Sequence, residues 1–102
     1  MQKNKSIIVL AGLKIKHQFC EEFVKRATDV VFLTRKEEGC IRYDLVRDVL
    51  DSDIFYFIEE YKDDETFQKH RVMPYMNPFR EFREQVVAEY FGVSTLEQIA
   101  HR

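Results

Sequence analysis

Two β-type runs joined by a short polar loop constrain the fold of this 102-residue chain more than any other feature. In the first run, Ile41, Tyr43 and Leu45 alternate with charged residues, a period of two that is typical of a strand with one buried face. The second run, Phe55–Tyr61, is rich in aromatic and branched residues and alternates little, as expected of a strand that is covered on both faces. Because the Asp- and Ser-rich segment 48–53 joins the two runs, the pattern predicts a hairpin between an outer and an inner strand.

The residues before the hairpin predict a strand followed by a helix. The polar segment Met1–Ser6 is expected to be a loose lead-in, and Ile7–Leu13 is a continuous apolar run typical of a strand. From His17 onward the apolar residues recur at helical intervals, which predicts a helix from about Gln18 to Arg35. Gly39 is the expected turn residue after this helix.

Two helices are predicted after the hairpin. The acidic residues at 63–65 favour a short helix that Pro74 ends or kinks. Asn77, as a cap followed by proline, predicts a second helix that Gly92 closes. The apolar stripe of this second helix comprises Phe79, Phe82, Val86 and Tyr90. Two interpretations stay open for Val93–Arg102, namely a helix that begins with a capping box and a final strand.

With a final strand, the order of elements is that of the ferredoxin-like βαββαβ unit, an α+β fold with an antiparallel sheet. The apolar runs Ile7–Leu13 and Ile54–Ile58 then form the central strands, and the helices cover only one face of the sheet. The other face would expose a large apolar patch unless something covered it, and a second copy of the sheet is the simplest cover. We therefore expect one domain, residues 1–102, that forms a homodimer.

Composition and charge argue against several classes of partner. The net charge of −2, with both signs interspersed, indicates no nucleic-acid partner. The longest apolar run, Ile7–Leu13, is too short to span a bilayer and lacks the flanks of a signal peptide, so no membrane association is expected. Cys20 and Cys40 form neither a disulfide framework nor a metal-binding spacing, and a reduced, cytoplasmic setting is the simplest interpretation.

Four short motifs, in order and at matching spacing, carry a resemblance to a known family. The stretch EGCIRYD at 38–44 is followed by Glu59 and Tyr61, then by Asp64 with His70, and then by Pro74. From about Ile8 to Phe82 the chain resembles the antibiotic biosynthesis monooxygenase (ABM) family of dimeric α+β barrels. The resemblance implies that fold, together with a small organic substrate and no metal or flavin. The hairpin and the His-Pro segment are also similar to a family member that isomerises the phosphorylated autoinducer-2 signal.

Two departures from the family pattern limit the activity that the resemblance implies. Tyr75 stands where family members often carry a second histidine directly after the proline. The haem-degrading branch uses a tryptophan near the position of His70, and this chain contains no tryptophan, which argues against haem breakdown. Because the family includes oxygenases and isomerases, the resemblance constrains the fold more than the reaction.

His70 is the strongest candidate for catalysis. It follows Phe67 by one turn on the expected inward face of the short helix, and an imidazole exchanges protons near neutral pH. The alternative is a histidine that only caps or packs the helix. Glu59 and Tyr61 share one face of a strand, where they could orient a substrate and trade a proton, or serve only as structural side chains. The expected lining of the substrate pocket is Tyr43, Phe57, Phe67 and Tyr75.

No metal or cofactor site is expected. The three histidines, His17, His70 and His101, are scattered, with no carboxylate or thiolate at ligand spacing along the chain. No phosphate-cradling glycine loop or dinucleotide fingerprint is present. Acidic neighbours disfavour a thiolate at Cys20, whereas Arg42 favours one modestly at Cys40, and neither cysteine stands out as a nucleophile.

Three functions remain open at this point. The preferred one is a cofactor-independent monooxygenase that withdraws a proton from a small quinol- or polyketide-like molecule, whose anion then reacts with oxygen. His70, Tyr61 and Glu59 are the catalytic candidates. The second function uses the same groups for proton shuttling alone, in an isomerase similar to the one that acts on phosphorylated autoinducer-2. The third is a binding or stress protein without catalysis.

Overall fold

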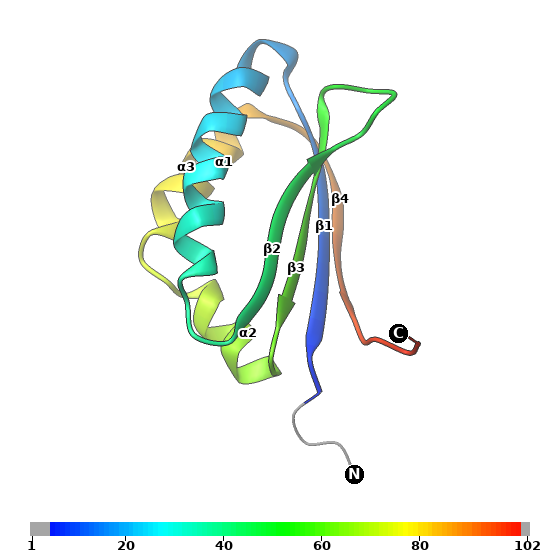
Figure 1. Cartoon of the computed structure of the whole chain (residues 1–102). Coiled ribbons are helices and arrows are strands. Elements are labelled where there is room, and N and C mark those ends of the chain that lie inside the picture. Colours follow the sequence, from blue (N-terminus) through cyan, green and yellow to red (C-terminus); the bar gives the residue numbers. More distant parts are fainter. Residues whose placement is uncertain (1–4, 101–102) are drawn as a thin grey trace.

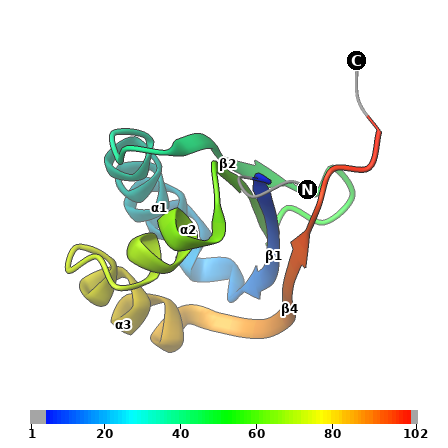
Figure 2. The same cartoon turned by 90° about the horizontal axis from the view of Figure 1, so that it is seen from below.

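The computed structural model describes residues 5–100, which form a four-stranded antiparallel sheet with helices on one face only (Figures 1 and 2). The elements in chain order are β1 (Ile7–Ile15), the 3-10 helix η1 (His17–Phe19), α1 (Cys20–Arg35), β2 (Cys40–Arg47), β3 (Ile54–Tyr61), α2 (Asp64–Arg71), α3 (Met76–Val86) and β4 (Val87–Leu96). The strands lie in the order β2-β3-β1-β4. The ferredoxin-like α+β fold, with the hairpin between an edge strand and a central strand, is therefore confirmed.

The hairpin loop is held by its own aspartates. The carboxylate of Asp48 accepts hydrogen bonds from the backbone amides of Leu50 and Asp51, at 2.7 and 2.9 Å. The carboxylate of Asp51 in turn accepts one from the amide of Asp53 at 3.0 Å. Aspartate favours such turns because its short side chain reaches amides two or three residues ahead. The loop thereby fixes the position of Asp53 at the start of β3.

The core lies between the inner face of the sheet and the helices. Every second residue of β3 is buried, from Phe55 to Tyr61, and Phe23 of α1 is fully buried against them. The ring centroid of Phe23 lies 5.0 Å from that of Phe55 and 5.9 Å from that of Phe79 in α3. Burying one such side chain stabilises the fold by about 1.5–3 kcal/mol, so this aromatic layer fastens α1 and α3 to the sheet.

The other face of the sheet is apolar and has no helix over it (Figure 1). Leu10, Val46 and Leu96 are exposed large hydrophobic residues on the central and edge strands of this face. Gly12 of β1 lies on the same face opposite Tyr56, where a β-carbon would come within 2.6 Å of the Tyr56 ring. Exposed apolar side chains on this face fit the expected homodimer, which remains a prediction.

The first helix and the turn after it agree closely with the sequence. The predicted start at Gln18 falls in the short 3-10 segment, and the α-helix itself ends at Arg35 as expected. Gly39 has φ +88°, a left-handed conformation that favours glycine. A β-carbon at this position would also come within 2.8 Å of Thr66, so Gly39 allows the start of β2 to approach α2 closely.

The predicted C-terminal helix was wrong at both ends. Tyr75, not Asn77, precedes the helix, and α3 ends at Val86 rather than at Gly92. Residues as far as Leu96 instead pair with β1, including Tyr90 opposite Leu13. A helical stripe continues through this segment, but the free edge of β1 offers backbone hydrogen bonds along its whole length, and tertiary pairing overrides local periodicity.

The tail forms the predicted final strand rather than a capping-box helix. β4 ends at Leu96, and residues 97–100 adopt no regular structure. The lead-in at 1–4 and the two last residues, which include His101, lie outside the described range. Within residues 5–100, none of the helices is long and apolar enough to cross a membrane.

Candidate active site

A cavity of about 610 Å³ lies between the sheet and helices α2 and α3, at the end of the sheet where β3 finishes. Its apolar walls include Phe57 from β3, Phe67 from α2 and Phe79 from α3. The polar and charged lining residues are Tyr43, Glu59, Gln68, His70, Arg71, Arg80 and Arg83. A cavity with apolar walls and convergent polar groups is typical of a small-molecule site.

Glu59 is the buried carboxyl group of this cavity. It lies on the inner face of β3 beside Tyr61, whose hydroxyl donates a 2.6 Å hydrogen bond to Glu59 Oε1. Burial raises the pKa of Glu59 to about 7, although the Tyr61 hydrogen bond opposes the shift. Burial and the neighbouring carboxylate also raise the pKa of Tyr61, so its hydroxyl stays protonated and keeps donating. Glu59 can therefore take up and release a proton near neutral pH.

His70 packs against two of the buried tyrosine rings. Its ring centroid is 5.5 Å from that of Tyr61 and 5.4 Å from that of Tyr43. The Nδ1 atom lies 3.2 Å from Oε2 of Glu37, and a carboxylate can only accept, so Nδ1 carries the hydrogen. Among the described residues, Nε2 has no hydrogen-bond partner, and the ring lines the cavity.

Burial lowers the pKa of His70 below its ordinary value, against the opposing effect of Glu37. The imidazole is therefore neutral at neutral pH and offers the lone pair of Nε2 to the cavity. A neutral imidazole held by a carboxylate at Nδ1 is the usual arrangement of a general base. Two proton acceptors, Glu59 and His70, thus serve one cavity.

Comparison with known proteins identifies the family. The family model described as antibiotic biosynthesis monooxygenase (ABM) matches residues 6–87. The chain belongs to this family. It is 32% identical over 73 residues to a Bacillus subtilis protein named "Putative monooxygenase YcnE". The matched residues make up 72% of this chain and 77% of that protein.

Solved structures show the same fold as this ABM domain. The crystal structure of PA3566 from Pseudomonas aeruginosa superposes with a TM-score of 0.87 at 24% identity, over 98% of this chain and all of that one. Rv0793 from Mycobacterium tuberculosis superposes with a TM-score of 0.86 at 20% identity, over 94% of this chain and 97% of that one. At these identities the likeness establishes the fold, and the chemistry must be argued from the residues of this chain.

The structure brings most of the predicted site residues of the ABM domain together. His70 and Glu59 line the cavity, as do Tyr43, Phe57 and Phe67. Tyr61 is fully buried behind Glu59 and reaches the cavity only through that carboxyl group.

Tyr75 does not line the cavity. Its hydroxyl bonds to Glu37 and lies 2.8 Å from Oγ1 of Thr34. Tyr75 therefore belongs behind Glu37, where it orients the carboxylate that holds His70.

Sequence reasoning missed Glu37 and the arginines. Glu37 follows the end of α1 outside any periodic pattern, so nothing in the sequence links it with His70, 33 residues later. Arg71, Arg80 and Arg83 were not among the candidate site residues, yet all three line the cavity. A search for cations three or four residues apart near the predicted pocket would have found Arg80 and Arg83.

Neither cysteine is activated as a nucleophile. Burial is the main cause that raises the pKa of Cys20 to about 11, with Asp53 adding to it. Burial also raises the pKa of Cys40 to about 11, so the expected modest bias toward a thiolate at Cys40 was wrong. Arg42, from which that bias was inferred, instead directs its side chain to Asp44 at 2.7 Å.

Within the described part of the chain, one grouping of side chains could hold a metal ion, and it lies away from the cavity. His17, Cys20 and Asp53 place one ligand atom each within 4.8 Å of one another. The expectation of no metal site rested on spacing along the chain, which hides Asp53 because it lies 33 residues after Cys20.

Proposed function

We propose that this ABM domain is an oxygenase that works without a resident cofactor on a small, acidic, aromatic or polyketide-like molecule. The observation that carries the proposal is the buried Glu59 at the cavity wall, whose pKa of about 7 makes it a proton acceptor near neutral pH. Family membership supports the oxygenase chemistry. The apolar walls suit a flat ring system and shelter a reactive anion from water.

The reaction begins with removal of a proton from a CH₂ group that a neighbouring carbonyl or phenol makes acidic. Glu59 accepts this proton, while Tyr61 holds the carboxylate in place through its hydrogen bond. The carbanion transfers its electrons to O₂, a C–O bond forms, and the protonated Glu59 returns its proton to complete a hydroperoxide. Loss of water across the C–H and O–O bonds leaves a carbonyl, so that CH₂ and O₂ give C=O and H₂O.

The rim of the cavity favours a substrate with a negative charge. Arg71, Arg80 and Arg83 line it, while the lining contains one carboxyl group, Glu59. Among the described residues, neither Arg71 nor Arg80 lies within 4.0 Å of a carboxylate, and Arg80 donates to the backbone carbonyl of Arg71 at 2.5 Å. Guanidinium groups bind carboxylates and phosphates through paired hydrogen bonds, so we assign an acidic group of the substrate to this rim.

The same rim supports an isomerase of a small phosphorylated keto compound as the second candidate. In that case Glu59 and His70 move a proton between two carbons of the substrate, and no oxygen is consumed. The two functions share the binding step and differ in the fate of the anion.

The protein is proposed to act as a homodimer in the cytoplasm. The exposed apolar face that includes Leu10, Val46 and Leu96 supports self-association, and the free thiols of Cys20 and Cys40 fit a reducing compartment. Sedimentation at micromolar concentration should give a dimer, and Leu10→Glu should dissociate or aggregate it. A stable wild-type monomer under those conditions would contradict the dimer.

Oxygen uptake with a panel of hydroquinones and anthrone-type phenols, each with and without a carboxylate, tests the proposed reaction. We expect uptake that matches product formed, with a lower KM for the acidic member of each pair. Arg80→Ala should raise the KM of the acidic substrates and leave that of their neutral analogues unchanged. Turnover of a phosphorylated keto compound without oxygen uptake would favour the isomerase, and tight binding without turnover of either class would contradict both.

A further inference from the structure

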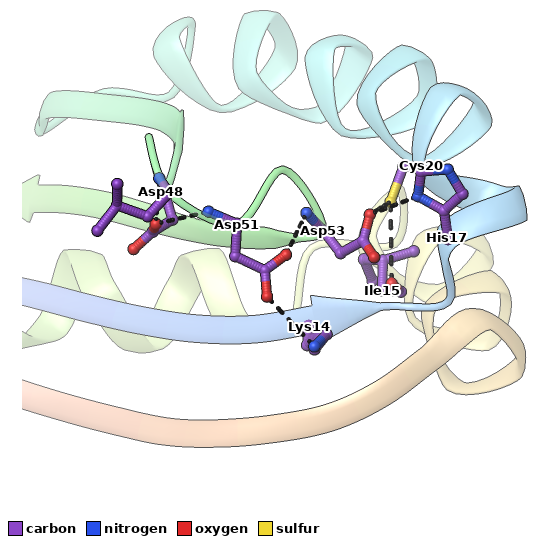
Figure 3. A network of polar contacts seen from close by, with 8 residues as sticks. Lys14, Ile15, His17, Cys20, Asp48, Asp51 and Asp53 are labelled. Atoms are coloured by element: carbon purple, nitrogen blue, oxygen red, sulfur yellow. Dashed lines mark hydrogen bonds and ion pairs between the residues drawn. The ribbon is translucent and has the colours of Figure 1, made fainter.

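A second cluster of chemically active side chains lies at the opposite end of the sheet from the cavity. His17 precedes α1, Cys20 begins α1, and Asp53 ends the hairpin loop at the start of β3 (Figure 3). Oδ1 of Asp53 lies 2.8 Å from His17 Nδ1 and 3.4 Å from Cys20 Sγ. Three different ligand types, drawn from two distant parts of the chain, therefore converge on one point.

We propose that His17, Cys20 and Asp53 form a binding site for Zn²⁺, with a fourth position open to water or a small ligand. In a tetrahedral zinc site the bonds of about 2.0–2.3 Å place the ligand atoms roughly 3.3–3.7 Å apart. The three ligand atoms lie within 4.8 Å of one another, so the ion fits with a small movement of the His17 ring. That movement is unhindered because the His17 side chain is largely exposed.

The ligand types select zinc over the common hard cations. Calcium and magnesium prefer oxygen ligands, whereas imidazole nitrogen and cysteine sulfur suit Zn²⁺ and similar transition metals. A cavity of about 420 Å³, lined by the three ligands with Glu21 and Ser52, leaves room for the fourth ligand.

The charges around the cluster permit a cation. Arg47 also lines this cavity, but its guanidinium lies 4.8 Å from the centroid of the Phe55 ring and stacks over it. Lys14 is paired with Asp51 at 3.2 Å. Glu21 of α1 also lines this cavity, and its carboxylate adds negative charge near that of Asp53.

The site would add a second link between two segments that already pack through Phe23 and Phe55. A metal there fastens the start of α1 to the start of β3, and a ligand that binds the folded state alone raises its stability. This effect needs neither the ABM reaction nor its substrate. The metal-site proposal and the oxygenase proposal can therefore be contradicted independently of each other.

Cobalt absorbance of the 102-residue chain, freed of metal with a chelator and then dialysed, tests the site. We expect Co²⁺ to give a thiolate-to-cobalt charge-transfer band that saturates at one equivalent, and Zn²⁺ to abolish this band and raise the melting temperature. His17→Ala should weaken Zn²⁺ binding about a hundredfold or more, because even partners outside the ligand set change affinity by 10–100-fold. Cys40→Ser, which removes the other free thiol, should bind as the wild type does.

Cys20 is buried, so Cys20→Ser can disturb folding, and the exposed His17 gives the decisive variant. Absence of the thiolate band, or a wild-type affinity equal to that of His17→Ala, would overturn the proposal.

Discussion

Two histidine–carboxylate pairs of similar geometry lie at opposite ends of the sheet and behave in opposite ways. His70 and Glu37, 3.2 Å apart, have side chains that are only 5% and 8% exposed. His17 and Asp53, 2.8 Å apart, have side chains that are 82% and 19% exposed. The pKa of His70 lies below its ordinary value, whereas the hydrogen bond to Asp53 raises the pKa of His17 above it.

The difference teaches that burial, and not the presence of a carboxylate partner, decides what each histidine can do. Removal from water destabilises the charged imidazolium of His70 more than Glu37 stabilises it. Water solvates most of the His17 side chain, so the attraction of Asp53 prevails there. The first pair suits proton transfer to a substrate, and the second suits a cation that replaces the proton.

The largest effect is expected from removing the buried imidazole. His70→Ala should lower turnover by about 10²–10⁴-fold, the usual contribution of a general acid or base. The variant also removes ring contacts with Tyr43 and Tyr61, which can lower the amount of folded protein. Turnover should therefore be compared with the fraction of folded protein, measured by circular dichroism. If activity falls only in step with folded protein, His70 is structural and the contrast between the two pairs has no catalytic meaning.

Glu59→Gln should change how stability depends on pH. The pKa of Glu59 rises from 4.5 to about 7 on folding, so the folded state binds more protons than the unfolded state between these values. The contribution of Glu59 to the free energy of unfolding therefore falls as pH rises from about 4.5 to 7, by on the order of 3 kcal/mol in total. Denaturant unfolding should show the variant to be more stable than the wild type at pH 8, with the difference vanishing near pH 4. Parallel stability curves would show that Glu59 is solvated rather than buried.

Tyr75→Phe should have a smaller effect on the buried pair. The tyrosine hydroxyl bonds to Glu37, and its loss leaves that carboxylate more available to His70. The pKa of His70 should therefore rise, and the acid limb of the pH–rate profile should move to higher pH with it. An unchanged profile would remove Tyr75 from the support of the site.

Asp53→Asn should have the smallest effect and act on the exposed pair alone. Without the carboxylate, the pKa of His17 should fall toward its ordinary value, while that of His70 stays the same. Proton NMR of the two rings measures both shifts in one experiment. A shift of His70 as well would mean that the two ends of the sheet are coupled.

The sequence predicted the sheet order and placed five residues that line the cavity, because both follow from short-range patterns. Alternation places Glu59 and Tyr61 on one face of β3, and helical spacing places His70 with Phe67. The boundary between α3 and β4 at Val86 was missed because the apolar residues around it fit both a helical stripe and a strand. Only pairing with the free edge of β1 decides between the two.

Partners that meet across the fold left no trace in the sequence. Glu37 meets His70, and Asp53 meets Cys20, each across 33 residues and from a loop without periodicity. Such contacts depend on how the hairpin and helices are placed in space, which no local pattern encodes. The roles assigned to His70, Glu59 and Tyr61 remain predictions until a substrate is tested.

The pKa values of the histidines, measured by NMR titration of the ring protons, test the central claim most directly. His17→Ala and His101→Ala variants assign the signals, since the chain contains three histidines. We expect His70 to titrate below the ordinary value of 6.5 and His17 above it, so that His70 is neutral at pH 7 and ready to accept a proton. Equal values for the two rings, or a His70 that is charged at pH 7, would contradict the claim that burial keeps His70 neutral as a proton acceptor of the active site beside Glu59.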